Sequence, residues 1–340
     1  MREKPALQDK KIIGYLSDHY GLDVTDIVFR PLGNDSAASV YRVVTKDGAT
    51  YFLKVKHGFV PEISLHIPRY LKDQRINPVV APLRTHDQRL FGTIEPFTLI
   101  LYPYVAGDVG MAVGLSAEQW VMFGTIVQQF HGVNLPPSLL VNIRKEDFVL
   151  PPEWWEIAHH LQNAIQTNTY NNPFERQLAA FWQARHAEIS TILLQAKELG
   201  RILQNRTLDF VLCHADIHTA NLLLSDHGDL FVVDWDQPIL APKERDLMFV
   251  VEDATGGSVV EGKPETLFFK GYGEVTIDPL VLAYYRYEWV VQEIGDYGER
   301  VFLMEDASDA LKEESTNGFI ELFNPGDVVD AAYHSLRALS

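Results

Sequence analysis

The sequence predicts an α+β protein with a small, strand-rich N-terminal lobe and a larger, mostly helical C-terminal lobe. The chain has 340 residues, enough for about two domains of ~150 residues or one large two-lobed unit. Segments with strand character dominate residues 1–102, whereas apolar residues at helical spacing dominate residues 111–340. Proline and glycine interrupt regular structure at residues 103–110, where we expect a hinge between the lobes.

Residues 1–102 are expected to contain one helix, a set of strands and a second, interrupted helix. Apolar spacing predicts the first helix at residues 12–20, and Gly21 ends it. The second helix is expected at residues 61–74, where Pro68 should kink or split it. Strands are expected at residues 27–29, 40–44, 50–56, 89–94 and 98–102. A turn at Asp47 and Gly48 joins the second of these strands to the third.

The strand at residues 50–56 carries different side chains on its two faces. Leu53 and Val55 share one face, because successive side chains of a strand point to opposite sides. Lys54 and Lys56 share the other face. The apolar face is expected to pack on a core, and Lys54 is expected to face a cleft. Lys56 is expected to be solvated.

Residues 111–340 have a mostly helical pattern. Ser116 begins a helix, and Gln119 completes its capping box. A long helix is expected at residues 174–199, with Gly200 as its stop. Two short apolar strands that surround a loop follow at residues 210–213 and 230–233.

Composition excludes several classes of protein. Hydrophobic residues make up 46% and charged residues 22% of the chain, as in ordinary globular proteins. The single cysteine, Cys213, excludes a disulfide framework and a Cys-x-x-Cys zinc or redox site. The N-terminus lacks the apolar core of a signal peptide, and no run of ~18 apolar residues predicts a membrane span. We expect a cytoplasmic protein.

The formal net charge of −17 limits the choice of partners. Phosphate backbones and anionic lipid surfaces would be repelled, so we expect neither a nucleic-acid partner nor a membrane partner. A cationic small molecule would be attracted. The alternative, that the charge only keeps the protein in solution, stays open at this point. We expect a monomer or a weak homodimer.

Acidic, amide and imidazole side chains gather around the two short strands. An acid and an amide on a loop, followed by an acid at a strand end, make an oxygen-rich site for Mg²⁺. Such a site suits phosphoryl transfer, in which the metal bridges phosphates and an aspartate positions the acceptor hydroxyl. The cluster consists of His214, Asp216, His218, Asn221, Asp234 and Asp236.

Two other interpretations of this cluster remain open. His214, Asp216 and His218 alternate, so on an extended backbone they would face one way and form the transition-metal site of a hydrolase. Asp234 and Asp236 alone would suit the metal-binding pair of a nucleotide-sugar transferase. The hydrolase hypothesis leaves Asn221, Asp234 and the lysine strand without a role.

The pattern His214-x-Asp216-x-His218-x-x-Asn221, followed by Val233-Asp234-Trp235-Asp236, resembles the aminoglycoside phosphotransferase family. The resemblance covers nearly the whole chain, and choline kinases share the pattern. Residues 51–58, 241–249 and 271–274 are most similar to the spectinomycin phosphotransferases of this family. The resemblance implies a two-lobed, protein-kinase-like fold and a transfer of the γ-phosphate of ATP with Mg²⁺. GTP in place of ATP stays an open alternative.

The resemblance also implies roles for individual residues. Asp216 would be the catalytic base, and Asn221 and Asp234 would hold Mg²⁺. Lys54 would bind the α- and β-phosphates and pair with Glu62, and His214 would brace the loop. The matching phosphate loop has one glycine and would use Gly33, Asn34 and Ser36, although a plain hairpin turn is the alternative there. The hinge that binds adenine would include Leu101, Tyr102 and Tyr104.

The acceptor implied by the resemblance is a hydroxyl of an aminocyclitol or aminoglycoside, with antibiotic resistance as the result. Candidate substrate-binding acids are Asp236, Glu288, Glu293 and Asp296, and the alternative for the last three is a solvated helix face. Other open functions are the phosphorylation of choline, a sugar or an amino acid, and nucleotide binding without catalysis.

Overall fold

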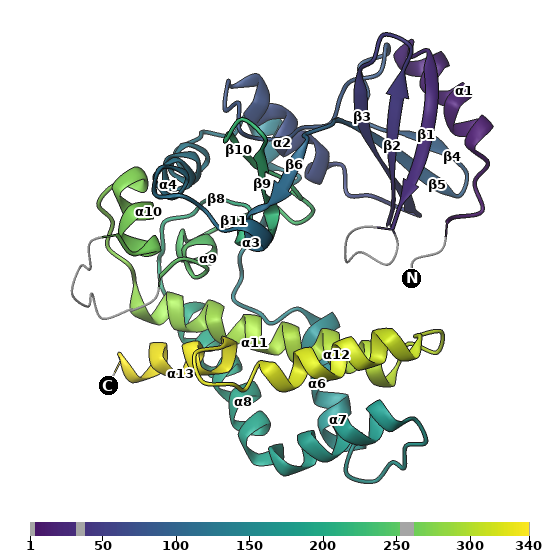
Figure 1. Cartoon of the computed structure of the whole chain (residues 1–340). Coiled ribbons are helices and arrows are strands. Elements are labelled where there is room, and N and C mark those ends of the chain that lie inside the picture. Colours follow the sequence, from purple (N-terminus) through teal and green to yellow (C-terminus); the bar gives the residue numbers. More distant parts are fainter. Residues whose placement is uncertain (1–3, 32–37, 252–261, 340) are drawn as a thin grey trace. The chain divides into compact units, whose positions relative to one another are not determined.

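Figure 1 shows the computed structural model, which describes residues 4–31, 38–251 and 262–339. The chain divides into two units. The first unit consists of Met1–Arg144, Leu212–Leu240 and Leu267–Gly273, and the second of Lys145–Val211, Ala241–Thr266 and Glu274–Ser340. The predicted lobe boundaries stay a prediction.

An antiparallel five-stranded sheet dominates the N-terminal part of the first unit. Its strand order is β1-β2-β3-β5-β4, so neighbouring strands are mostly consecutive in the chain. The turn at Asp47 and Gly48 joins β2 to β3, as predicted. The strands are β1 (Val24–Arg30), β2 (Ala38–Thr45), β3 (Thr50–His57), β4 (Gly92–Ile94) and β5 (Phe97–Pro103).

One face of this sheet packs on α1 (Asp9–Tyr20), which Figure 1 shows beside β1. Ile12 and Leu16 of the helix are fully buried against Leu53 and Val55 of β3, which are the apolar side chains of the alternating strand. Gly21, with φ 67°, ends α1 in the left-handed conformation that glycine adopts without strain.

The opposite face of the sheet carries a second, smaller cluster, in which Val60, Leu65 and Leu90 surround Ile100. Leu65 belongs to α2 (Ile63–Asp73), the predicted second helix. Pro68 was expected to kink or split this helix, and the split is wrong. A proline removes one helical hydrogen bond, here to the carbonyl of Ser64, and α2 continues through it because Ile67, Pro68 and Leu71 are buried.

The rest of the first unit supports the loops that carry the candidate site. A three-stranded sheet of order β10-β9-β6 lies there, and its first strand, β6, falls within the expected hinge. Helix α4 begins at the predicted capping box of Ser116 and Gln119. These elements are β6 (Gly107–Val109), α3 (Gly110–Val113), α4 (Ala117–His131), α5 (Pro137–Leu140), the short 3₁₀ helix η1 (Thr219–Asn221), β9 (Leu222–Ser225) and β10 (Leu230–Val232).

The second unit is helical and is built around its longest helix, α11 (Pro279–Phe302), which packs against α6, α8, α12 and α13 (Figure 1). The mostly helical remainder, together with the N-terminal antiparallel sheet, confirms the predicted α+β class. The other helices are α6 (Pro152–Ala164), α7 (Pro173–Ala184), α8 (His186–Leu203), α9 (Glu244–Leu247), α12 (Asp309–Glu321) and α13 (Val328–Arg337).

Three short strands and α10 (Pro264–Tyr272) occur where the chain passes from one unit to the other. The strands are β7 (Arg144–Lys145), β8 (Val211–Cys213) and β11 (Ile239–Ala241). No helix among residues 4–31, 38–251 and 262–339 is both long enough and apolar enough to span a membrane.

The predicted long helix at residues 174–199 is wrong in two respects. It consists of two helices, α7 and α8, because the backbone of Arg185 leaves the helical conformation at φ −107° and ψ 14°. It also continues past Gly200 to Leu203. Gly200 does not end the helix. It allows the backbone of α8 to pack closely on Phe148, since a Cβ at this position would lie 2.4 Å from the carbonyl oxygen of Phe148.

Asp278 caps α11 and binds an arginine at the same time. Its Oδ1 accepts hydrogen bonds from the backbone N–H groups of Leu280 and Val281, and its Oδ2 lies 2.7 Å from a guanidinium nitrogen of Arg206. Burial would raise the pKa of Asp278, but the hydrogen bonds from Arg206 and Val281 outweigh it and lower the pKa.

Replacing Asp278 by alanine should lower the free energy of unfolding by ~1–2 kcal/mol, as for other N-cap losses. Asp278→Asn should lower the free energy of unfolding by less than Asp278→Ala does, because the amide oxygen still caps the helix. The pKa is lower in the folded state, so the carboxylate stabilises the fold above its unfolded pKa of about 4, and this contribution is lost as the pH falls further. Urea denaturation of the three proteins across pH checks this, and equal stability of alanine variant and parent at pH 7 would contradict it.

Candidate active site

The loop after β8 is fixed to the loop after β10 by one buried imidazole. The Nε2 of His214 lies 2.9 Å from the carbonyl oxygen of Val233, and its Nδ1 lies 3.3 Å from the backbone nitrogen of Asp216. A carbonyl oxygen only accepts and an amide only donates, so Nε2 carries the proton and Nδ1 accepts. His214 is 1% exposed, so its bonds hold the two loops together away from water.

Both carboxylate oxygens of Asp216 are held in place. Oδ2 accepts a hydrogen bond of 2.9 Å from the side-chain amide of Asn221, which also donates to the backbone carbonyl of Asp216 at 2.7 Å. Oδ1 lies 3.2 Å from Nε2 of His218. The backbone N–H of Ala220 donates to Nδ1 of His218, so Nε2 is the protonated nitrogen and donates to Asp216.

These bonds keep Asp216 in its ionised form. Burial would raise the pKa of Asp216, but the hydrogen bond and electrostatic field of the His218 ring, the field of the His214 ring and the hydrogen bond from Asn221 together lower it. The loop therefore presents a carboxylate of fixed orientation that can accept a proton.

Backbone strain is present on both loops. Ala215 has φ 74° and Asp234 has φ 64°, in the left-handed region that residues other than glycine seldom occupy. Each such residue costs about 1–3 kcal/mol and persists only where its surroundings enforce it. Here Ala215 precedes the candidate catalytic base Asp216, and Asp234 is itself a candidate metal ligand.

The loop after β10 brings Asp234 beside Asn221. The backbone N–H of Val233 donates to the carbonyl of Asn221 at 3.0 Å. Trp235, which is 3% exposed, anchors the loop by ring contacts with His214 and Phe130 at centroid distances of 4.6 and 5.3 Å. The two candidate metal ligands thus lie on adjacent, mutually bonded segments.

The ligand atoms of this pair fit a hard divalent cation. The amide nitrogen of Asn221 is used to hold Asp216, which leaves Oδ1 as the ligand atom, and Asp234 supplies carboxylate oxygen. Mg²⁺ prefers such oxygen ligands. Asn221 and Asp234 are therefore the residues that could hold the metal.

The interpretation of His214, Asp216 and His218 as the transition-metal site of a hydrolase is wrong. Ala215 turns the backbone at φ 74°, so the segment is not extended. Both ring nitrogens of His214 are used in hydrogen bonds to the backbone, so neither is available as a ligand.

Lys54 of β3 reaches both aspartates of the second loop. Its Nζ lies 3.2 Å from Oδ1 of Asp234 and 3.1 and 3.0 Å from the two carboxylate oxygens of Asp236. Burial would lower the pKa of Lys54, but the charges of Asp234 and Asp236 outweigh it and raise the pKa. Lys54 is therefore protonated at neutral pH and suited to binding an anion.

Lys56 differs from its expected solvated state. Its Nζ lies 3.3 Å from Oδ2 of Asp236, and its side chain is only 17% exposed. Lys56 lies on the same face of β3 as Lys54, and the carboxylate of Asp236 contacts the ammonium groups of both lysines.

The expected ion pair between Lys54 and Glu62 is wrong. Glu62 precedes the first residue of α2, its side chain is 60% exposed, and its carboxylate lies 3.5 Å from His66. Among the residues that the structure describes, no ion pair joins Glu62 to Lys54. The position at the start of the helix directs Glu62 to solvent, and Asp236 takes the place expected for it.

The expected hinge residues occupy different environments. The side chain of Leu101 is buried in the core under α1, and its carbonyl accepts a hydrogen bond from Leu83. Tyr102 lies on the face of the sheet that carries Lys54, opposite Phe52. Tyr104 is 41% exposed. The predicted phosphate-loop residues Gly33, Asn34 and Ser36 lie outside the described residues.

The candidate substrate acids of α11 belong to the second unit. Glu288 is 3% exposed and lies 3.4 Å from Arg245, so the expectation that it lines an open cleft is wrong. The reason is the apolar surroundings of α11, which bury this side of the helix. Glu293 accepts a hydrogen bond from the indole of Trp289. Burial raises the pKa of Asp296. The roles of Glu293 and Asp296 stay predictions.

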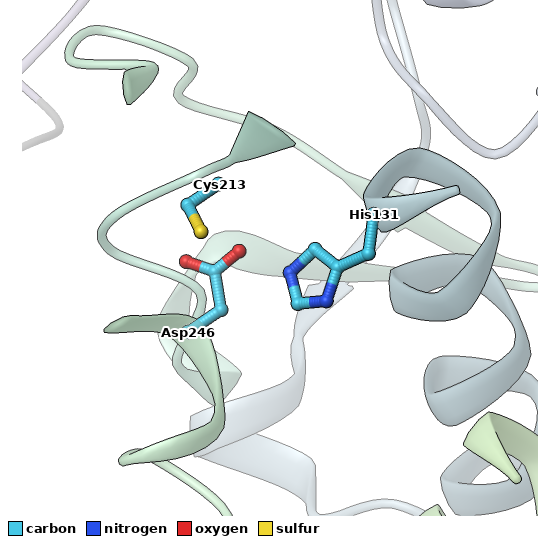
Figure 2. Close-up of side chains that lie close together, drawn as sticks. All are labelled: His131, Cys213 and Asp246. Carbon is cyan, nitrogen blue, oxygen red and sulfur yellow. The ribbon is translucent and has the colours of Figure 1, made fainter. Parts of the chain in front are cut away.

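A buried histidine and cysteine lie near the candidate active site. Figure 2 shows His131 of α4 and Cys213 of β8 in the first unit, with a ring nitrogen and Sγ within 4.8 Å of each other; it also draws Asp246, a residue of the second unit. Nδ1 of His131 lies 2.9 Å from the hydroxyl of Tyr272. Two ligands from one unit are fewer than a structural zinc site uses, so we assign no metal to this pair.

Sequence reasoning missed the role of His218 as a hydrogen-bond donor to Asp216 and the ion pair of Lys56. One signal was available for the first, since His218 is a polar residue two positions beyond Asp216 on the same short loop. No local signal connects Lys56 with Asp236, because 180 residues separate them.

Comparisons with known proteins identify the family of the chain. Residues 28–276 match the model of the phosphotransferase enzyme family. The structure of spectinomycin phosphotransferase APH(9)-Ia in complex with ADP and spectinomycin has 33% sequence identity and a TM-score of 0.85, and the match covers 98% of this chain and 100% of that chain. The AMP-bound complex of the same enzyme gives 31% identity, a TM-score of 0.80, and coverage of 96% and 98%.

A more distant structure shows the fold alone. Choline kinase LicA from Streptococcus pneumoniae has 16% identity and a TM-score of 0.53, with coverage of 97% of this chain and 98% of that chain. No curated protein sequence matches the chain. The family match and the identity of one third over nearly the full length carry the conclusion: the chain belongs to the phosphotransferase enzyme family, as a small-molecule kinase with the kinase-like fold.

Proposed function

We propose that this kinase transfers the γ-phosphate of ATP to a hydroxyl group of an aminocyclitol antibiotic of the spectinomycin class, and so confers resistance. The observation that carries the proposal is the 33% identity over 98% of the chain with an enzyme whose structure contains ADP and spectinomycin. The net charge of −17 supports a cationic acceptor of this kind.

Asp216 orients the acceptor hydroxyl and takes its proton as the oxygen attacks the γ-phosphorus. The bond from the γ-phosphorus to the β,γ-bridging oxygen breaks, and ADP leaves. His218 and Asn221 support this step because they hold both oxygens of Asp216. A positioned acid–base group of this kind contributes about 10²–10⁴-fold to the rate.

Asn221 and Asp234 would hold Mg²⁺, which would supply positive charge to neutralise the phosphates. Lys54 binds the α- and β-phosphates through its ammonium group, which is already positioned by Asp234 and Asp236. Tyr102, on the same face of the sheet, borders the nucleotide.

Asp216→Asn should lower kcat by ~10²–10⁴-fold, because the amide cannot accept the proton. The dissociation constant for ADP should stay unchanged, since Asp216 does not contact the nucleotide. Steady-state kinetics and calorimetry measure the two effects, with Asp226→Asn, an exposed aspartate in the turn between β9 and β10, as the matched control. Near-normal turnover of the Asp216 variant would remove this residue from the mechanism.

His218→Ala should lower kcat by ~10–100-fold, which corresponds to the loss of one hydrogen bond to a charged group. The KM for ATP should change little, because His218 acts on Asp216 and not on the nucleotide. His218→Gln, whose amide nitrogen can still donate, should recover part of the rate. Equal rates for the glutamine and alanine variants would show that the hydrogen bond to Asp216 is unimportant.

The substrate proposal is tested by ADP release over a panel of aminocyclitols, aminoglycosides, choline and neutral sugars. Spectinomycin should have the highest kcat/KM. Its kcat/KM should fall as ionic strength rises, because salt screens charges beyond a Debye length of ~10 Å at 0.1 M. A preference for choline or a neutral sugar would replace the proposed acceptor, and absence of turnover with every compound would favour nucleotide binding without catalysis.

A further inference from the structure

We propose that Asp236 is the carboxylate that positions Lys54, and that it holds Lys56 beside Lys54 as a second phosphate-binding ammonium group. The inference rests on the proposed ATP-dependent reaction and adds to it a two-lysine phosphate site. Asp236 was expected to bind the acceptor substrate, and Glu62 was expected to pair with Lys54; the contacts of both residues differ from those expectations.

The contacts of Asp236 point to this role. Its Oδ2 lies 3.0 Å from Nζ of Lys54 and 3.3 Å from Nζ of Lys56, so one oxygen bridges the two ammonium groups. Its Oδ1 makes a further contact of 3.1 Å with Lys54. Asp234 contributes one oxygen to Lys54, whereas Asp236 uses both of its oxygens on the lysines.

The neighbouring strands offer these lysines no other carboxylate. Lys54 pairs in register with Val40 of β2 and Ile100 of β5. Lys56 pairs with Ala38 and Thr98. Among the described residues of β2 and β5, the lysines therefore have no cross-strand carboxylate, and Asp236 reaches both of them from the loop after β10.

Burial makes this arrangement costly without Asp236. The side chains of Lys54 and Lys56 are 13% and 17% exposed, although lysine side chains are ordinarily solvated. Two ammonium groups on the same strand face repel each other, and the repulsion grows as water is excluded. The negative charge of Asp236 offsets the repulsion, and its Oδ2 holds both ammonium groups beside it.

Two neighbouring ammonium groups fit the chemistry of a nucleoside diphosphate better than that of an uncharged acceptor. Adjacent α- and β-phosphates carry negative charge on separate oxygens, so Lys56 can neutralise charge that remains beside Lys54. Asp236 keeps its contacts with the lysines in this arrangement and does not touch the nucleotide, which makes it a positioning residue.

The experiment compares Asp236→Asn, Asp236→Glu, Lys56→Met and Glu62→Gln by calorimetric titration with ADP and with adenosine, in the absence of acceptor. Asp236→Asn and Lys56→Met should each raise the dissociation constant for ADP by about tenfold and leave that for adenosine unchanged, because adenosine has no phosphate. Asp236→Glu, which retains the charge, should recover part of the ADP affinity. Glu62→Gln should have a smaller effect than Asp236→Asn.

Kinetics with ATP supply the second readout. Asp236→Asn should raise the KM for ATP and lower kcat, since misplaced lysines bind the nucleotide less well and align it less well. An ADP affinity of Lys56→Met equal to that of the parent would overturn the two-lysine site. A larger effect of Glu62→Gln than of Asp236→Asn on ADP binding would return the positioning role to Glu62.

The design separates failure of this inference from failure of the proposed substrate. Binding of ADP and adenosine is measured without any acceptor, so it is independent of which hydroxyl compound the enzyme phosphorylates. The thermal unfolding midpoint of each variant identifies loss of fold, and the charge-conserving glutamate variant keeps the comparison decisive if Asp236→Asn unfolds.

Discussion

The ion pairs of Lys54 with Asp234 and Asp236 are the contact on which the candidate active site depends. They connect a strand of the N-terminal sheet to a loop 180 residues further along the chain. Neither partner is stable in this place alone, because a partly buried ammonium group or a pair of neighbouring carboxylates is unfavourable without opposite charge. Electrostatics as well as packing therefore places the face of β3 that carries Lys54 against the loop that carries Asp234 and Asp236.

The chemistry-bearing loops could be located from the sequence because their members are close in the chain. Asp216 and Asn221 lie on one short loop, and Asp234 follows the next strand, so spacing alone places them near each other. The partner of Lys54 could not be located in this way. The sequence analysis expected Glu62 to pair with Lys54 and Asp236 to bind the acceptor, because the contact between Lys54 and Asp236 depends on the tertiary path of the chain, which local patterns do not record.

The same distinction explains the errors in the fold. The strands of the sheet and the capping box of α4 follow from alternation and local hydrogen bonding, and both were predicted. The break between α7 and α8 has no proline or glycine, and the apolar spacing continues through Arg185. Gly200 carries the ordinary signal of a helix end, yet its role is set by Phe148, a residue far away in sequence.

The buried ring of His214 has a mechanical consequence. It is hydrogen-bonded to the backbone of Asp216, the candidate catalytic base, and to the backbone of Val233, which precedes the candidate metal ligand Asp234. A displacement of either loop would stretch a hydrogen bond that no water can replace, since the ring is buried. The two loops are therefore held together as one rigid unit. The hydrogen bonds of His214 therefore couple the positions of the candidate base Asp216 and the candidate metal ligand Asp234, so that a shift of one is transmitted to the other.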